Sequence, residues 1–209
     1  MATESRSKII SSYDDTDYVY YSATNLSNGY AGSDSTTYAQ INLVRGANAV
    51  SYIFWKFPPL SEIPSNATID SVTCTCKCLI SSTSTNYIAT RQARLYSGTT
   101  AMGSNKSVPN STTAFTITAG TWTRAQLQDP KLRLYAVRGT QNVNTNYYFR
   151  FYGATLTVTY TYQDTQFKIR VKQNGSWVSA TKVFVKRRDA WEPATRVFGK
   201  LSGTWKESK

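Results

Sequence analysis

The sequence predicts an all-β protein, in which an antiparallel, jelly-roll-like β-sandwich is followed by a small domain of three β-hairpin repeats. Three observations support this prediction. Only 17% of the 209 residues are charged, and Ser, Thr, Asn and 15 Tyr take their place; Thr and aromatic residues favour strands. Short alternating segments separated by turn clusters fill most of the chain. A basic pattern then recurs three times at the end of the chain.

The sandwich is expected over residues 13–162, after an N-terminal arm at residues 1–12. Its strands include "YIFWKF" at 52–57 and "ATLTVTYTY" at 154–162. In the second of these, large apolar residues alternate with Thr, as in a strand with one buried face. Many short strands with turns at regular spacing are typical of an antiparallel sandwich.

Three cysteines, Cys74, Cys76 and Cys78, alternate along the segment "IDSVTCTCKCLI". In a strand they share one face, about 6.5–7 Å apart, which is too far for disulfide bonds along the strand. They have neither the spacing nor the His partners of a zinc site. We therefore expect small buried core residues in a chain folded in a reducing compartment.

A single short helix is predicted after Trp122. Thr123 and Gln126 have the spacing of a capping box. The helix is expected to end at Asp129-Pro130.

Residues 163–166 are expected to form a polar linker, and residues 167–209 three repeats of fourteen residues. Each repeat is predicted to be a strand, a tight turn and a return strand led by Trp. Asn174-Gly175 in the first repeat is typical of a type I′ hairpin turn. One hairpin cannot hide its apolar face, whereas three in series can share one.

Positive charge is concentrated in these repeats. The net charge is +12; residues 1–164 hold 13 basic and 9 acidic residues, whereas residues 165–209 hold 11 basic and 3 acidic residues. Such a segment indicates an acidic partner or simply a solvated face. The candidate binding residues are Trp177, Trp191, Trp205, Lys172, Lys186, Arg187, Arg188 and Lys200. The tryptophans either pack the hairpins together or form a platform for a ligand.

No catalytic residues and no cofactor are predicted. The chain has no His, so a Ser–His or Cys–His nucleophile pair cannot exist. Asp14, Asp15 and Asp17 are candidate Ca²⁺ ligands, or alternatively a plain acidic turn. No apolar run approaches the roughly 18 residues of a membrane span, and the first residues lack the apolar core of a signal peptide.

Two sequence patterns resemble a β-sandwich module common in structural proteins of tailed bacteriophages. Ile-Pro-x-x-Ala-x-Ile-x-x-Val begins at Ile63, and Tyr-Gly-x-x-x-x-Val-x-Tyr begins at Tyr152. The segments Asp17–Val19 and Asn28-Gly29 are similar to the opening of DNRLRE-type sandwich modules of bacterial surface proteins. This resemblance covers about residues 13–162 and brings no active site with it.

The repeats resemble units that end tail-associated and other virion proteins of phages infecting Gram-positive hosts. The matching positions in the first copy are Val171-Lys172, Gly175, Trp177, Ala180 and Phe184-Val185-Lys186. Together, the two resemblances imply a non-enzymatic virion structural protein, assembled in the cytoplasm of the bacterial host. It would be associated with the tail or baseplate.

The expected partners are other virion proteins and further copies of the chain, without a membrane. Four alternatives stay open. The first two are a head fibre or capsid decoration protein, and a carbohydrate-binding adhesin that recognises host cell-wall glycans. The others are a nucleic-acid-binding protein, which would depend on the basic repeats, and last a glycosidase, which would need two facing carboxylates.

Overall fold

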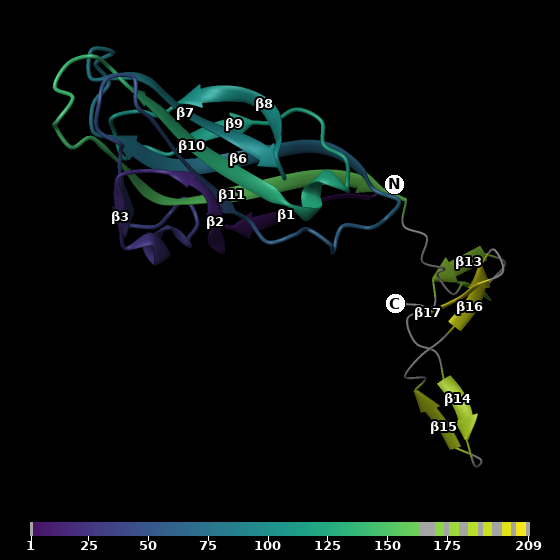
Figure 1. Cartoon of the computed structure of the whole chain (residues 1–209). Coiled ribbons are helices and arrows are strands. Elements are labelled where there is room, and N and C mark those ends of the chain that lie inside the picture. Colours follow the sequence, from purple (N-terminus) through teal and green to yellow (C-terminus); the bar gives the residue numbers. More distant parts are fainter. Residues whose placement is uncertain are drawn as a thin grey trace. The chain divides into compact units, whose positions relative to one another are not determined.

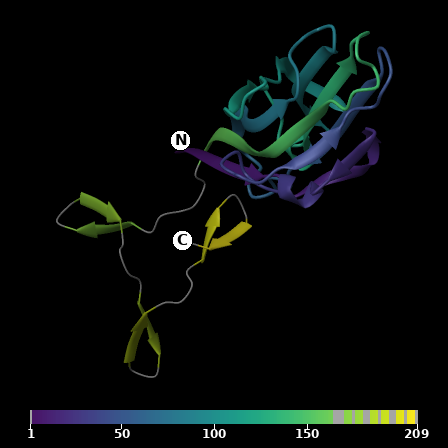
Figure 2. The ribbon, with the colours of Figure 1, turned by 90° about the vertical axis from the view of Figure 1, so that its left-hand side faces the viewer.

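The computed structural model describes residues 2–163 and six short stretches beyond them: 170–173, 176–179, 184–187, 190–193, 198–201 and 204–207. The chain divides into two compact units, Met1–Tyr162 and Gln163–Lys209. The first unit contains two antiparallel sheets that lie face to face (Figures 1 and 2). The predicted all-β class is therefore confirmed. Among the residues described, no helix has the length and apolar character needed to cross a membrane.

The first sheet is organised around its longest strand, β11 (Tyr148–Tyr162). Its hydrogen-bonded order is β3-β4-β11-β6-β9, and β1 also pairs with β11. The other strands are β1 (Ala2–Ile9), β3 (Ser22–Thr24), β4 (Ala39–Asn42), β6 (Thr68–Ile80) and β9 (Phe115–Thr118). Along β11, apolar residues such as Leu156 and Val158 are buried, whereas the alternating Thr residues point outwards. The alternation in the sequence thus becomes one core face and one hydroxyl face.

The second sheet has the order β2-β5-β10-β7-β8. Its strands are β2 (Ser12–Val19), β5 (Val50–Lys56), β7 (Ile88–Ser97), β8 (Thr100–Ser107) and β10 (Pro130–Arg138). From β4 to β7, successive strands alternate between the two sheets. Each connection between these strands therefore passes from one sheet to the other. Jelly-roll connectivity in the strict sense stays a prediction.

The core lies between the sheets and contains a pair of large aromatic rings. Trp55 of the second sheet stacks on Phe151 of the first, with 4.4 Å between the ring centroids. Gly29, in the 3₁₀-helix η1 (Leu26–Gly29), packs so closely that an added Cβ would lie 2.6 Å from the Trp55 ring. This stack joins the two sheets through buried aromatic area.

The three cysteines are buried in this core, as predicted. Cys74, Cys76 and Cys78 are fully inaccessible and free. Burial in apolar surroundings raises the pKa of each thiol well above its usual range. They therefore pack as small apolar side chains.

The predicted helix after Trp122 is present as a short 3₁₀-helix, η2 (Gln126–Gln128). The expected capping pair forms: the Thr123 amide donates to Gln126 Oε1 at 2.7 Å, and the Gln126 amide donates to Thr123 Oγ1 at 3.3 Å. The helix stays this short because Pro130 already begins β10.

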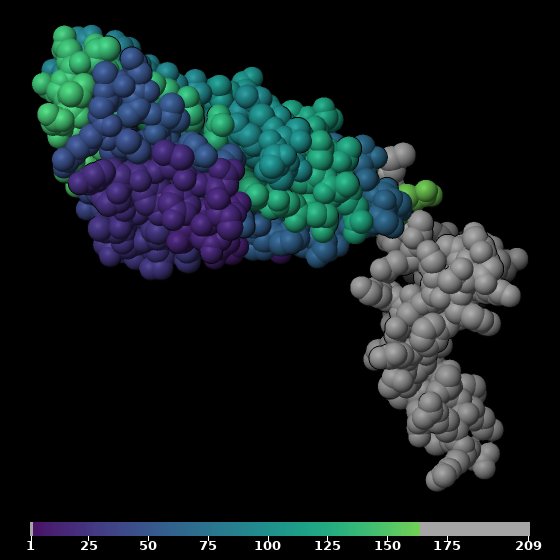
Figure 3. All heavy atoms as spheres, in the orientation of Figure 1, coloured from purple at the N-terminus to yellow at the C-terminus, as the bar shows by residue number. Residues whose placement is uncertain are grey.

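The N-terminal segment differs from the expected arm. Residues 2–9 form β1, which pairs with the second half of β11 from Ala2 opposite Tyr162 to Ile9 opposite Thr155. Ser and Thr hydroxyls bond across this pair, for example Ser7 Oγ to Thr157 Oγ1 at 3.0 Å. Figure 3 shows the purple N-terminal residues packed directly against the rest of the first unit. The strand was missed because backbone and hydroxyl hydrogen bonds hold it, with little apolar burial to mark it in the sequence.

The described stretches of the second unit form three antiparallel strand pairs. They are β12 (Arg170–Gln173) with β13 (Ser176–Ser179), β14 (Phe184–Arg187) with β15 (Ala190–Pro193), and β16 (Phe198–Leu201) with β17 (Thr204–Glu207). The register is the same in each pair and sets one Lys opposite one Trp: Lys172 opposite Trp177, Lys186 opposite Trp191, and Lys200 opposite Trp205. The fourteen-residue spacing thus corresponds to three strand pairs of equal length. Of the predicted linker 163–166, only Gln163 is among the described residues.

Candidate functional site

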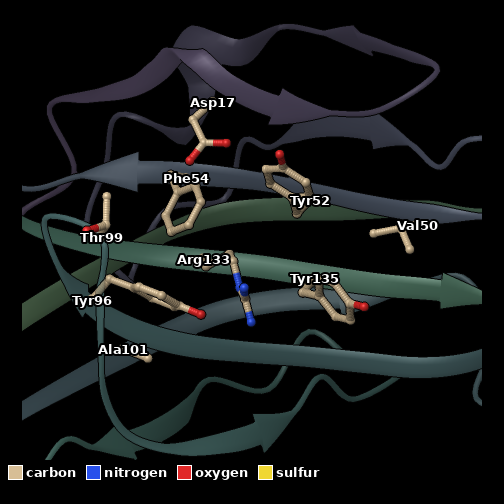
Figure 4. Close-up of a pocket in the computed structure, with 9 residues that line it drawn as sticks. All are labelled: Asp17, Val50, Tyr52, Phe54, Tyr96, Thr99, Ala101, Arg133 and Tyr135. Carbon is tan, nitrogen blue, oxygen red and sulfur yellow. The ribbon is translucent and has the colours of Figure 1, made fainter.

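A groove lies on the outer face of the second sheet, over the central strands β5 and β10 (Figure 4). It has a volume of about 500 Å³. Four of its nine lining residues are aromatic, and one arginine and one carboxylate also line it. The lining residues are Asp17, Val50, Tyr52, Phe54, Tyr96, Thr99, Ala101, Arg133 and Tyr135.

Strand β5 forms this groove because it is apolar on both faces. Ile53 and Trp55 are buried towards the core, so the alternating residues Tyr52 and Phe54 point outwards. In a sheet exposed on its outer side, polar residues normally occupy these positions. The departure indicates an outer face that is built to contact another molecule.

The aromatic rings hold one another in fixed edge-to-face contacts. The centroids of Tyr52 and Phe54 are 6.1 Å apart, and those of Phe54 and Tyr96 are 5.1 Å apart at 89°. Phe54 and Tyr96 are only 8% and 7% exposed although they lie on an outer face. The apolar wall of the groove is therefore ordered before any ligand binds.

Arg133 extends between two tyrosine rings of the groove, as Figure 4 shows. Its guanidinium carbon lies 4.8 Å from the Tyr96 centroid and 4.9 Å from the Tyr135 centroid. Its Nε is buried and has no acceptor within the described part of the chain. The cation is held in place by aromatic faces, and no hydrogen bond to a described residue uses its Nε donor.

Carboxylates near the groove are already engaged. A hydrogen bond to Asp17, together with burial, raises the pKa of Tyr52. At one end of the sheet, Asp14 Oδ2 lies 3.0 Å from Lys131 Nζ and 3.4 Å from Lys56 Nζ. Burial would raise the pKa of Asp14, but hydrogen bonds from Thr16 and Lys131 hold it well below its usual range.

These contacts bear on the calcium candidates Asp14, Asp15 and Asp17. Asp14 is 5% exposed and faces two lysines, whereas Asp17 bonds Tyr52. Over the described ranges, no three His, Cys, Asp or Glu residues come together in a geometry suited to a metal ion. The structure thus does not bring the three carboxylates together, because lysine and tyrosine partners direct two of them elsewhere.

The predicted binding residues of the repeats are located only in part. The backbone positions of seven of the eight are defined, and Arg187, for example, lies opposite Ala190. The eighth, Arg188, lies outside the described residues, and so do the side chains of the other seven. Both expected roles of the tryptophans, packing the hairpins and binding a ligand, stay predictions.

The groove was not predicted from the sequence. Residues 52–57 were expected to form a strand, but Tyr52 and Phe54 were given no role of their own. An apolar run on a strand expected to have one solvated face was the available signal. The position of Arg133 between two rings depends on cross-strand register, which the sequence does not specify.

No known protein-family model matches the chain, and a search of curated proteins finds no significant match. The chemistry of the groove must therefore be inferred from its own residues. It combines an apolar aromatic wall, tyrosine hydroxyls and a guanidinium that has no acidic partner among the described residues. This combination suits the binding of an amphipathic, hydroxyl-rich ligand.

Proposed function

We propose that the chain is a non-enzymatic virion protein of a tailed bacteriophage, whose β-sandwich binds a glycan of the host surface. The observation that carries the binding function is the aromatic groove on the outer face of the second sheet. Sugars have apolar C–H faces and many hydroxyl groups. An aromatic wall packs against the first, and tyrosine hydroxyls with a guanidinium bond the second.

The groove favours a glycan over a nucleic acid. Stacking of bases requires free ring faces, but Phe54 and Tyr96 are packed against each other and nearly buried. One face of Tyr135 is covered by Arg133. The groove therefore offers an apolar wall with a polar edge, which fits a saccharide better than a row of stacked bases.

Placement on a phage particle rests on the sequence resemblances, with a tail or baseplate position as the first choice. The protein would associate with other virion proteins and with its own copies through buried aromatic area and basic complementarity. Assembly from a cytoplasmic pool of the host accords with three free, buried cysteines.

A second candidate function is assembly on the head, as a fibre or decoration protein. The repeated Lys–Trp register of the three strand pairs in the second unit favours such a docking role. Electron microscopy of intact particles tests it: stoichiometric density on the capsid supports decoration, and density at the tail tip supports the first choice.

Binding of the full chain to isolated cell walls of Gram-positive bacteria tests the groove. Tyr135→Ala is expected to weaken binding at least about tenfold, because it removes one of the aromatic residues that line the groove and one of the two rings that hold Arg133. Tyr148→Ala is the matched control: this tyrosine lies on the first sheet and contacts Arg150 at the same 4.9 Å. An equal loss in both variants, or no binding by the unaltered chain, would contradict the proposal.

A further inference from the structure

The groove residue Arg133 has a second arginine as its cross-strand neighbour, an arrangement that an uncharged glycan does not explain. On β10, Arg133 is directly opposite Arg94 of β7, so both side chains lie on the outer face of the sheet. The Nε atoms of both arginines are buried and have no hydrogen-bond partner in the described residues. Like charges directly opposite each other destabilise a sheet unless something neutralises them.

In the described segments no ion pair joins a carboxylate to Arg133 or Arg94. Asp17, the one carboxylate that lines the groove, is hydrogen-bonded to Tyr52 instead. The ion pairs of the first unit join Glu4 to Arg6, Glu62 to Lys8, and the carboxylates of Asp14 and Asp129 to Lys56 and Lys131. On the second sheet, acids are therefore paired with lysines at one end. Neither arginine of the Arg133–Arg94 pair has an acidic partner among the residues that the structure describes.

We propose that the ligand of the groove is an anionic glycan, with a phosphate or carboxylate group bound between the guanidinium groups of Arg133 and Arg94. This inference rests on the proposed function. Planar guanidinium groups bind such anions through paired N–H donors. Arg133 is already oriented by Tyr96 and Tyr135, so little side-chain entropy is lost on binding. The sugar or polyol backbone then lies along the aromatic wall formed by Tyr52, Phe54 and Tyr96.

Calorimetric titration of the full chain with three polymers tests this inference. The probes are poly(glycerol phosphate), polygalacturonate and neutral dextran. We expect at least one anionic polymer to bind about tenfold or more tightly than dextran, and the preferred one identifies phosphate or carboxylate as the bound group. Arg94→Gln should weaken that binding about tenfold, because charge-assisted hydrogen bonds are lost.

The basic second unit also attracts anionic polymers, but it is the same in every variant. A matched control variant therefore isolates the contribution of Arg94. Arg150→Gln causes the same change in charge on the outer face of the first sheet and is expected to change affinity less than twofold. If Arg94→Gln does not fold, Arg94→Lys retains the charge but loses the planar fork, and a loss of several-fold is expected.

The outcomes separate this inference from the proposed function. Equal binding of dextran and the anionic polymers, with no difference between the Arg94 and Arg150 variants, overturns the inference and leaves a glycan-binding protein. Tighter binding of a single-stranded oligonucleotide that depends on Arg94 also overturns it. Failure of all three polymers and of cell walls to bind removes the proposed function itself.

Discussion

Two arginines in similar surroundings lie on opposite outer faces of the sandwich. Arg133 is on the second sheet and Arg150 is on the first, and each guanidinium contacts two tyrosine rings. The rings are Tyr96 and Tyr135 at 4.8 and 4.9 Å for Arg133, and Tyr38 and Tyr148 at 4.7 and 4.9 Å for Arg150. The difference is in the hydrogen bonds: Arg150 Nε donates to Gln40 Oε1 at 3.3 Å, whereas Arg133 Nε has no acceptor in the described chain.

The comparison separates two uses of one residue cluster. On the first sheet, the Gln40 side chain accepts a hydrogen bond from Arg150. Farther along β11, Ser and Thr hydroxyls bond one another across strands. On the second sheet, the aromatic support is the same, but Arg133 Nε is buried without an acceptor in the described chain. Buried donors without acceptors are costly to a fold, and such a cost is typical of binding sites.

A third arginine, Arg138, is completely buried, and its replacement is expected to have the largest effect on the stability of the fold. Its side chain is inaccessible to solvent. It donates to backbone carbonyls of Tyr87, Val44, Asn142 and Val143, and its guanidinium lies 4.5 Å from the Tyr147 centroid.

Arg138→Met is expected to lower the free energy of unfolding by about 3 kcal/mol, because several buried carbonyls lose their donor. Urea denaturation followed by circular dichroism measures the change. Arg150→Gln is the control, with an expected cost of about 1 kcal/mol. A cost below about 1 kcal/mol for Arg138→Met would contradict a structural role for this residue.

The second-largest effect on stability concerns Lys56 and Lys131, which form ion pairs, whereas Arg133 and Arg94 form none with the described residues. Asp14 bridges Lys131 and Lys56, and hydrogen bonds hold its pKa below the unfolded value of about 3.9. A lowered carboxyl pKa stabilises the fold above the unfolded pKa, and this contribution is lost as the pH falls below about 4.

Asp14→Asn should therefore cost about 2 kcal/mol at pH 7 and progressively less as the pH falls below 4. Urea unfolding at pH 7, 4 and 2.5 measures the trend. Asp15→Asn, a neighbouring residue exposed to solvent, is the control. A cost for Asp14→Asn that does not change with pH would show that the ion pairs contribute nothing.

The two outer faces also show what sequence patterns can predict. The alternation in 154–162 correctly predicted a buried face for β11, and the spacing of Cys74, Cys76 and Cys78 correctly predicted their burial. Both are local properties of one strand, because side-chain direction alternates with period two.

The groove and the strand β1 could not be predicted in the same way. Arg133 and Arg94 become neighbours only through the pairing of β10 with β7, whose strands are about 40 residues apart in the sequence. Strand β1 depends on an edge of β11, which is even more distant along the chain. Register between distant strands is a property of the whole fold, since no single segment encodes it.

The smallest expected effect is the difference in stability between the Arg133 and Arg150 variants, which tests the comparison directly. Arg133→Gln should cost less stability than Arg150→Gln, by about 0.5–1 kcal/mol, because it relieves the repulsion from Arg94 and breaks no hydrogen bond within the described chain. Arg150→Gln loses the bond to Gln40 with no such relief. Urea midpoints of both variants measure the difference. In an Arg94→Gln background the repulsion is absent, so Arg133→Gln should then lose its advantage. An equal cost for Arg133→Gln with and without Arg94 would mean that the two guanidinium groups do not interact, and the case for an anion between them would lose its physical basis.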